Sequence, residues 1–360
     1  MNELLVVEDS GDVRLDRPGS KGRHSIGQSA ATAKLVSAAW TPDGDTVVLA
    51  ESTGGIEGRL AFHSVATGER STVEHGFVSF YLSPSPDGSR VAHLSTGPLG
   101  LELGVVDLGT GAGRLVERGQ PLYWSWRPDS GGLAVHVGDT VVLHDLDGGR
   151  EVLTTAAGRF LVPVWGWDGS VTYGMDDELV VRAADGTMAT ILAGVAPLRF
   201  AADPDNRRIA FADPDDEGQV GLAVLDVLTG RRDVVLDEPT AGFFWSPDGR
   251  YLAALVAGDG AGSVRWAVWD GDGTDRLTSF VPGSSWSREV LPFFEQYALS
   301  HSVWSADGSA LVATGRPGGG PVEVLVQPVG PGTAAPATPR GPGRLAWWRP
   351  RSADGEAPDG

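Results

Sequence analysis

The chain has 360 residues, and its 28 lysines and arginines against 47 aspartates and glutamates leave a formal net charge of −19. A surface this acidic repels phosphate backbones and anionic lipid, which argues against nucleic acid as a partner. Because the chain contains no cysteine, disulfides, thiolate catalysis and cysteine-ligated zinc or iron–sulfur sites are excluded.

The first residues carry no recognisable export signal. Residues 1–12, MNELLVVEDSGD, have no basic start, only a short apolar stretch, and acidic residues early in the segment. No apolar run in the sequence approaches the roughly 18–20 residues that span a bilayer. We therefore expect a cytoplasmic protein with no direct membrane insertion.

Short strands are predicted from the N-terminus onward. Residues 3–8 and 12–17 are strand-like, and a weaker third segment falls within 24–35. From residue 36 the chain becomes repetitive. Most copies have an aromatic residue, followed by a small residue, Pro-Asp-Gly or a variant of it, and a short apolar strand; the copies at 84–88 and 202–206 begin with proline and alanine instead. The copies lie at 40–44, 84–88, 126–131, 167–169, 202–206, 245–249 and 304–308, with a partial copy at 347–350.

Each copy is typical of a β-hairpin turn. Proline presets the backbone angle of the first turn position, aspartate hydrogen-bonds back to the main chain, and glycine or asparagine takes the left-handed position. A second turn follows in most copies, for example at 67–69 and 229–231. Four strands for each repeat of about 40 residues is the signature of a β-propeller blade.

The two chain ends decide the predicted number of blades. Full units begin near residues 36, 80, 122, 162, 198, 242 and 301, which makes seven. The last copy supplies one strand at 344–349, and the N-terminus supplies three. Together they complete an eighth blade and close the ring, which removes exposed strand edges. We predict an all-β propeller of eight four-stranded antiparallel blades, with seven blades as the alternative. Residues 1–350 are predicted to form a single domain, followed by a flexible polar tail at 351–360.

The Trp-Ser-Pro-Asp-Gly motif at 245–249 and its variants resemble the WD40-like repeat of TolB-like propellers. They also resemble the propeller of dipeptidyl-peptidase and prolyl-oligopeptidase enzymes. The resemblance covers nearly the whole chain and implies the fold. It implies little about function, because the motif is a structural turn. The Gly-x-Ser-x-Gly elbow of those peptidases' hydrolase domain does not occur in this sequence.

One segment breaks the repeat. The interval between Gly249 and Gly308 is 59 residues, against 37 to 44 elsewhere. The extra residues are expected to join the outer strand of one blade to the inner strand of the next, on the face where such connections cross. The segment also resembles, loosely, parts of bacterial propeller proteins that accompany ABC transporters. Loops of this kind on a rigid scaffold often carry function.

Two interpretations of this insertion at 280–301 stay open. In the first, its aromatic and polar side chains form a recognition patch for a protein partner. In the second, its aromatic side chains plug the central channel or cover a blade edge, and His301 is a polar residue at a strand start. The candidate binding residues are Trp286, Phe293, Phe294, Glu295, Gln296, Tyr297 and His301.

No cofactor is predicted, and no metal site has strong support. Asp270, Asp272 and Asp275 are spaced like half of a calcium loop. A complete loop needs six to eight oxygen ligands and ends on a bidentate glutamate, which is missing here. Aspartate–glycine turns explain the same pattern, so these three carboxylates are weak candidates only.

The sequence therefore favours a non-enzymatic, monomeric propeller that acts as a scaffold for a protein partner, in association with a membrane transport complex. One alternative is a metal-dependent hydrolase or lyase with carboxylates and histidines at the channel mouth. It requires at least three such side chains to converge on the channel axis. Another is a stand-alone relic of a peptidase propeller.

Overall fold

Turn residues and short apolar runs alternate along this chain, and in the structure, a computed structural model, the regular secondary structure is almost entirely β-strand. It describes residues 2–17, 23–27, 34–158, 161–193, 199–214, 220–330 and 335–351. Of the predicted tail, residues 352–360 lie outside the described residues. The single-domain boundary at 350 stays a prediction.

The first half of the chain forms β1 to β15. Their bounds are β1 (Leu4–Val7), β2 (Val13–Asp16), β3 (Arg23–Gly27), β4 (Lys34–Trp40), β5 (Thr46–Gly54), β6 (Glu57–Ser64), β7 (Arg70–Phe77), β8 (Ser79–Pro84), β9 (Arg90–Gly97), β10 (Gly100–Asp107), β11 (Gly113–Arg118), β12 (Leu122–Trp126), β13 (Gly132–Val137), β14 (Thr140–Asp145) and β15 (Arg150–Thr154).

The second half forms the other strands and three short helical segments. The strands are β16 (Val164–Trp165), β17 (Val171–Met175), β18 (Glu178–Arg182), β19 (Met188–Ala193), β20 (Phe200–Ala202), β21 (Arg208–Pro214), β22 (Val220–Asp226), β23 (Arg232–Leu236), β24 (Gly242–Trp245), β25 (Leu252–Ala257), β26 (Val264–Trp269), β27 (Thr274–Arg276), β28 (Val281–Pro282), β29 (Ala310–Arg316), β30 (Glu323–Pro328), β31 (Thr338–Pro342) and β32 (Leu345–Trp348). The helical segments are η1 (Trp286–Val290), η2 (Leu291–Phe293) and α1 (Phe294–Ala298). No helix formed by the described residues is long and apolar enough to cross a membrane.

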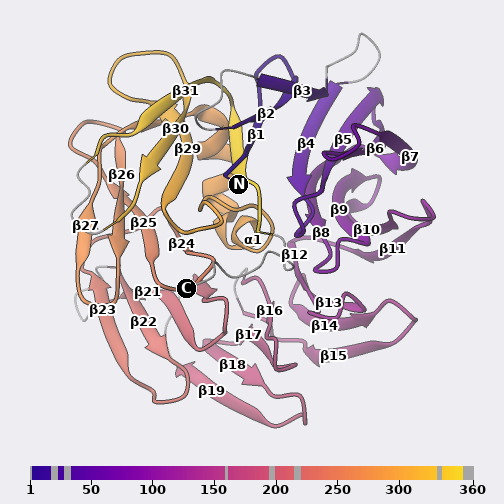
Figure 1. Cartoon of the computed structure of the whole chain (residues 1–360). Helices are drawn as coiled ribbons and strands as arrows, with labels where there is room; N and C mark the ends of the chain where they lie inside the picture. The colour runs from indigo at the N-terminus through magenta and orange to yellow at the C-terminus, as the bar shows by residue number, and fades with distance from the viewer. Residues whose placement is uncertain are drawn as a thin grey trace, which may run out of the picture.

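The described strands form eight antiparallel four-stranded sheets arranged as a ring of blades (Figure 1). Seven sheets take four consecutive strands each, starting at β4, β8, β12, β16, β20, β24 and β28. In these seven blades the first strand is innermost and borders the central channel (Figure 1). Apolar side chains from adjacent blades pack between the sheets and make the core. The predicted all-β propeller is confirmed.

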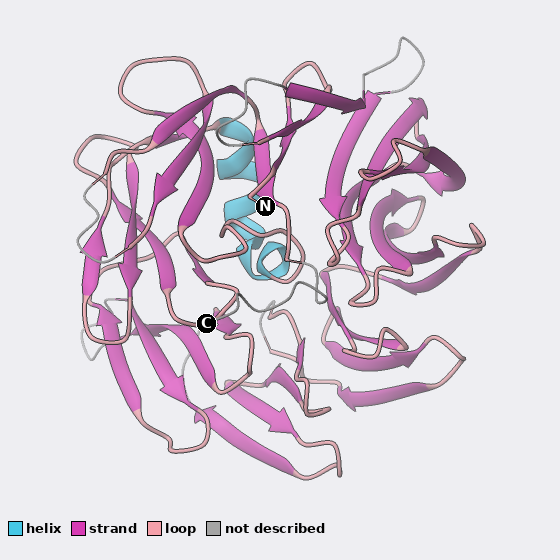
Figure 2. Ribbon diagram, in the orientation of Figure 1, coloured by secondary structure: helices cyan, strands magenta, loops and turns pink. Residues whose placement is uncertain are grey.

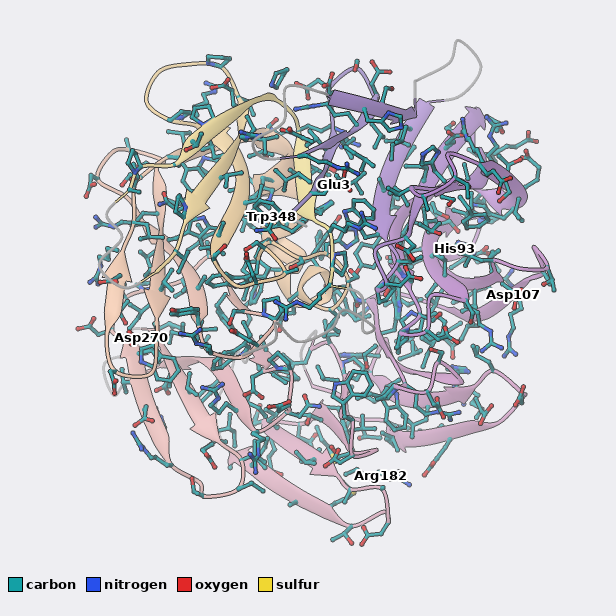
Figure 3. The ribbon with its side chains drawn as sticks, viewed as in Figure 1. Glu3, His93, Asp107, Arg182, Asp270 and Trp348 are labelled. Carbon is teal, nitrogen blue, oxygen red and sulfur yellow. The ribbon has the colours of Figure 1, made fainter. Side chains whose placement is uncertain are left out.

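The eighth blade is built from both ends of the chain. Its strand order is β3-β2-β1-β32, so the C-terminal strand is innermost and the three N-terminal strands lie outside it. Leu4 pairs with Trp348 and Val7 pairs with Leu345. Glu3 directly precedes Leu4 in the chain, so it lies close to Trp348 on the inner side of this blade (Figure 3). The eight-bladed prediction is confirmed, and the seven-bladed alternative is wrong.

The repeated turn has the predicted hydrogen bonds. In the copy at 245–249, Ser246 Oγ donates to Asp248 Oδ1 at 2.6 Å, and the same oxygen accepts the N–H of Arg250 at 3.1 Å. Gly249 has a φ of 69°, in the left-handed region. In the third copy Ser130, with a φ of 61°, takes this position in place of the expected Gly131. The Asp248 side chain therefore has a structural role that its local contacts explain.

The aromatic residue of the repeat links neighbouring blades. An indole N–H at the end of an inner strand donates to a backbone carbonyl of the preceding blade's inner strand, at 2.9 to 3.0 Å. The pairs are Trp126 with Ser83, Trp245 with Ala201 and Trp304 with Phe244. A buried indole usually finds such a partner, and here the bond sets the spacing between adjacent inner strands.

Candidate functional site

The insertion interrupts an inner strand and enters the central channel. β28 pairs with the end of β29, through Val281 opposite Arg316. The chain then leaves the sheet, forms η1, η2 and α1, and returns where Trp304 bridges to Leu311. The helical segments lie at the centre of the ring (Figure 2). We call residues 283–302 the plug. The seventh repeat therefore begins at β28 rather than near residue 301, because its inner strand is split in two.

Six of the seven predicted binding residues are buried inside the ring. Phe293 is the exception, with 45% of its surface exposed. The predicted recognition patch stays a prediction, but in this conformation only Phe293 among its members offers a large surface to a partner. The buried members are Trp286, Phe294, Glu295, Gln296, Tyr297 and His301.

Aromatic packing holds the plug against the blade that contains β24. The ring of Phe294 lies edge-on to Phe243 and Phe244, with centroid distances of 4.7 and 5.8 Å. Trp286 meets Trp266 in the same geometry at 5.8 Å. Such pairs add to the free energy of folding beyond the apolar area that they bury. The plug is therefore part of the hydrophobic core.

Two adjacent polar residues attach the plug to the inner strands of two blades that are separated by one blade. The Gln296 side chain accepts the N–H of Trp124 at 2.9 Å and donates to the carbonyl of Trp124 at 2.8 Å. Glu295 accepts the N–H of Phe200 at 3.2 Å. Trp124 lies in β12 and Phe200 in β20. Inner strands have a free edge facing the channel, and these side chains satisfy backbone groups that would otherwise be buried without a partner.

His301 anchors the end of the plug to a third blade. Its Nε2–H donates to the carbonyl of Ala38 in β4 at 3.2 Å, and its Nδ1 accepts from Ser300 Oγ at 2.6 Å. The hydroxyl of Tyr81 donates to the carbonyl of Gln296 at 2.8 Å. Burial lowers the pKa of His301 to about 3, so the imidazole is neutral at pH 7. Its contacts are those of a structural residue.

Glu295 is a buried carboxylate with an incomplete set of partners. Burial raises its pKa to about 7, against the opposing effects of the Arg199 guanidinium and the Phe200 N–H. Arg199 Nε is 3.8 Å from Glu295 Oε2, too far for a hydrogen bond. The Glu295 carboxylate also affects Tyr123. The pKa of Tyr123 is raised mainly by burial and, to a smaller extent, by the negative charge of Glu295.

Glu295→Gln is expected to change the pH dependence of stability. The folded-state pKa of Glu295, about 7, lies above its usual 4.5. The contribution of Glu295 to the free energy of unfolding is therefore complete below pH 4.5 and is lost as the pH rises through about 7. Relative to the variant, the native chain should lose up to about 3 kcal/mol of unfolding free energy between pH 4.5 and 8. Urea unfolding of both proteins at several pH values measures this difference. Parallel pH profiles would contradict it.

A cavity of about 1090 Å³ opens beside the plug. It is lined by residues from the plug and from the connections between blades, such as Gln120 and Arg344, so the plug lies on the face predicted for the insertion. Three predicted binding residues line it: Phe293, Gln296 and Tyr297. A concave site with aromatic walls and a few polar groups is the usual form of a ligand pocket.

Sequence reasoning missed the other walls of this pocket. Phe80 lines it and is 41% exposed, and Tyr123 and Arg288 also face it. One signal was available for Phe80. Phe80 and Tyr81 are adjacent in β8, and successive side chains of a strand point to opposite faces, so both could not enter the same core. For Tyr123 and Arg288 no local pattern pointed to a common site.

The weak calcium candidate is a turn. Asp270 Oδ1 accepts the N–H groups of Asp272 and Gly273 at 3.0 and 2.9 Å. These backbone hydrogen bonds lower the pKa of the Asp270 carboxyl. The turn joins β26 to β27 near the outer edge of its blade (Figure 3). Within the described ranges, no group of three or more histidine, aspartate or glutamate residues could hold a metal ion.

No protein-family model matches the chain, and a search of curated proteins finds no relative. Solved structures do match. A eukaryotic initiation factor is 12% identical with a TM-score of 0.65, and the match covers 98% of this chain and 100% of that one. A prolyl endopeptidase is 13% identical with a TM-score of 0.58, over 91% of this chain and 51% of that enzyme. The propeller domain of the Trilobed protease from Pyrococcus furiosus is 16% identical with a TM-score of 0.51. That match covers 82% of this chain and 95% of the protease domain.

The chain has the fold of a peptidase-type propeller. The resemblance that the repeat predicted is therefore confirmed for the fold. This chain corresponds to about half of the prolyl endopeptidase. At these identities the likeness concerns architecture and carries no activity with it.

Proposed function

We propose that this propeller is a non-catalytic binding module that docks a protein partner on its plugged face. The observation that supports the proposal most strongly is the pocket beside the plug, where the half-exposed rings of Phe80 and Phe293 come together with Tyr123. Aromatic side chains on a rigid frame are the usual anchors of protein interfaces. The plug supplies that frame because hydrogen bonds attach it to three separate blades.

The alternative function, a metal-dependent hydrolase or lyase with its site at the channel mouth, has no observation in its favour. It required at least three carboxylate or histidine side chains to converge, and the described part of the chain brings no such group together. Glu295 and His301 lie in the channel, but each is buried and bonded to the backbone of an inner strand. The association with a membrane transport complex is part of the proposal, and the identity of the captured partner tests it.

Phe293→Asp and Phe80→Asp are each expected to abolish capture of the partner. Both rings are half-exposed, so a charge there disrupts an apolar interface at little cost to folding. The measurement is affinity capture from native lysate with the tagged full chain, followed by identification of the bound proteins. Unfolding curves show whether each variant is folded.

The matched control is Trp167→Asp. Trp167 is 72% exposed and lies in the turn between β16 and β17, the first two strands of its blade. In an antiparallel blade that turn is at the opposite end from the pocket. A partner retained by the native chain and by the control, but lost by both phenylalanine variants, supports the proposal. Equal capture by all four proteins would refute it.

A further inference from the structure

The pocket holds one ion pair that is already complete. Arg344 Nη1 lies 3.2 Å from a carboxylate oxygen of Glu289, and Arg344 Nη2 donates to the carbonyl of Val36 at 2.8 Å. Both charged side chains line the cavity. Because they satisfy each other, they leave little charge for a ligand to neutralise.

Arg288 is different. It lines the same cavity, it is exposed, and among the described residues it has neither an ion-pair partner nor a hydrogen-bond partner. A guanidinium keeps its charge at every physiological pH and binds a carboxylate through two parallel hydrogen bonds. In a chain with a net charge of −19, Arg288 offers the pocket a positive charge that is not paired with a carboxylate of the described residues.

The neighbouring surface of the pocket is apolar. Phe293, five residues further along the plug, and Phe80 of β8 both present half-exposed rings to the cavity. The volume of about 1090 Å³ lies just above the roughly 300–1,000 Å³ typical of small-molecule pockets. It has room for several residues of an extended peptide.

We propose that the pocket binds a short extended segment of the partner that carries a bulky apolar side chain next to an aspartate or glutamate. The apolar side chain packs against Phe80 and Phe293, and the carboxylate pairs with Arg288. This inference rests on the proposed function and specifies the chemistry that the docking site recognises.

Asp9 provides a second test of the charge preference of the pocket. This exposed carboxylate lines the cavity from the turn between β1 and β2 and has no ion-pair partner among the described residues. A like charge across the pocket weakens the binding of an acidic segment. Asp9→Asn should therefore tighten binding, whereas Arg288→Gln should weaken it.

The experiment selects peptides from a random dodecapeptide library displayed on phage, with the full-length chain immobilised. Selected sequences should be enriched in Phe, Trp or Leu beside Asp or Glu. A labelled synthetic peptide of that sequence, amidated at its C-terminus, is then titrated by fluorescence anisotropy. Arg288→Gln, or Asn or Gln in place of the acidic peptide residue, should raise Kd about tenfold. The two changes combined should cost little more than one alone.

Arg250→Gln is the matched control. It removes the same charge from an exposed arginine in a turn at the opposite face, and it should leave Kd unchanged. Peptides that lose binding in Phe293→Asp but show no acidic preference, or a basic one, would overturn this inference and leave the proposed function standing. If no peptides are selected, or if those selected are insensitive to Phe293→Asp, both proposals fail.

Discussion

Gln296→Ala is expected to lower the free energy of unfolding by about 2–5 kcal/mol. The native amide bonds both the N–H and the carbonyl of Trp124, at 2.9 and 2.8 Å, in a buried part of the channel. Alanine leaves two buried backbone groups without partners. Each such group costs about 1–3 kcal/mol of desolvation that is no longer repaid. Equilibrium unfolding in urea, followed by tryptophan fluorescence, measures the change.

Gln120→Ala is the control for this prediction. Gln120 is an exposed glutamine of the same pocket, so its replacement should change stability by less than about 0.5 kcal/mol. A loss below about 1 kcal/mol in Gln296→Ala would contradict the proposed anchoring role. It would mean that water or another group satisfies the backbone of Trp124.

Phe294→Ala should destabilise the fold by about 3–5 kcal/mol. The ring is fully buried and packs against Phe243 and Phe244. Removing it leaves a cavity in the contact between the plug and the blade of β24, and the surrounding strands cannot collapse to fill it. The same urea unfolding experiment measures the loss.

Phe293→Ala is the adjacent and chemically identical control. Because Phe293 is half-exposed, its removal should cost less than about 1 kcal/mol while it weakens partner binding. The two neighbours are thus expected to separate stability from recognition. Equal loss of stability in both variants would contradict the packing of the plug described above.

The sequence alone predicts the blades well because each blade is encoded locally. The Pro-Asp-Gly turn, its serine and the left-handed glycine contact one another within six residues, as Ser246, Asp248 and Gly249 do. The spacing of the turns was sufficient to predict seven full blades. The closing blade was also predictable, because one strand was missing at the N-terminus and one was left over at the C-terminus.

The sequence located the irregular segment in the chain but did not decide which role it has in the ring. A break in the repeat showed where the irregular segment lies, and its aromatic content allowed either a recognition patch or a channel plug. The polar side chains of the plug bond to partners more than ninety residues away in the chain. Glu295 and Gln296 are neighbours, yet they bond to Phe200 and Trp124 in different blades.

The sequence by itself determined the architecture of this protein, since hairpin turns and alternating strands need only nearby residues. The tertiary structure alone decided the site. Closing the ring leaves the inner strands with free backbone groups facing the channel, and the plug is held there by satisfying them. The same closure brings Phe80, Phe293 and Arg288 into one pocket, although no local pattern relates them.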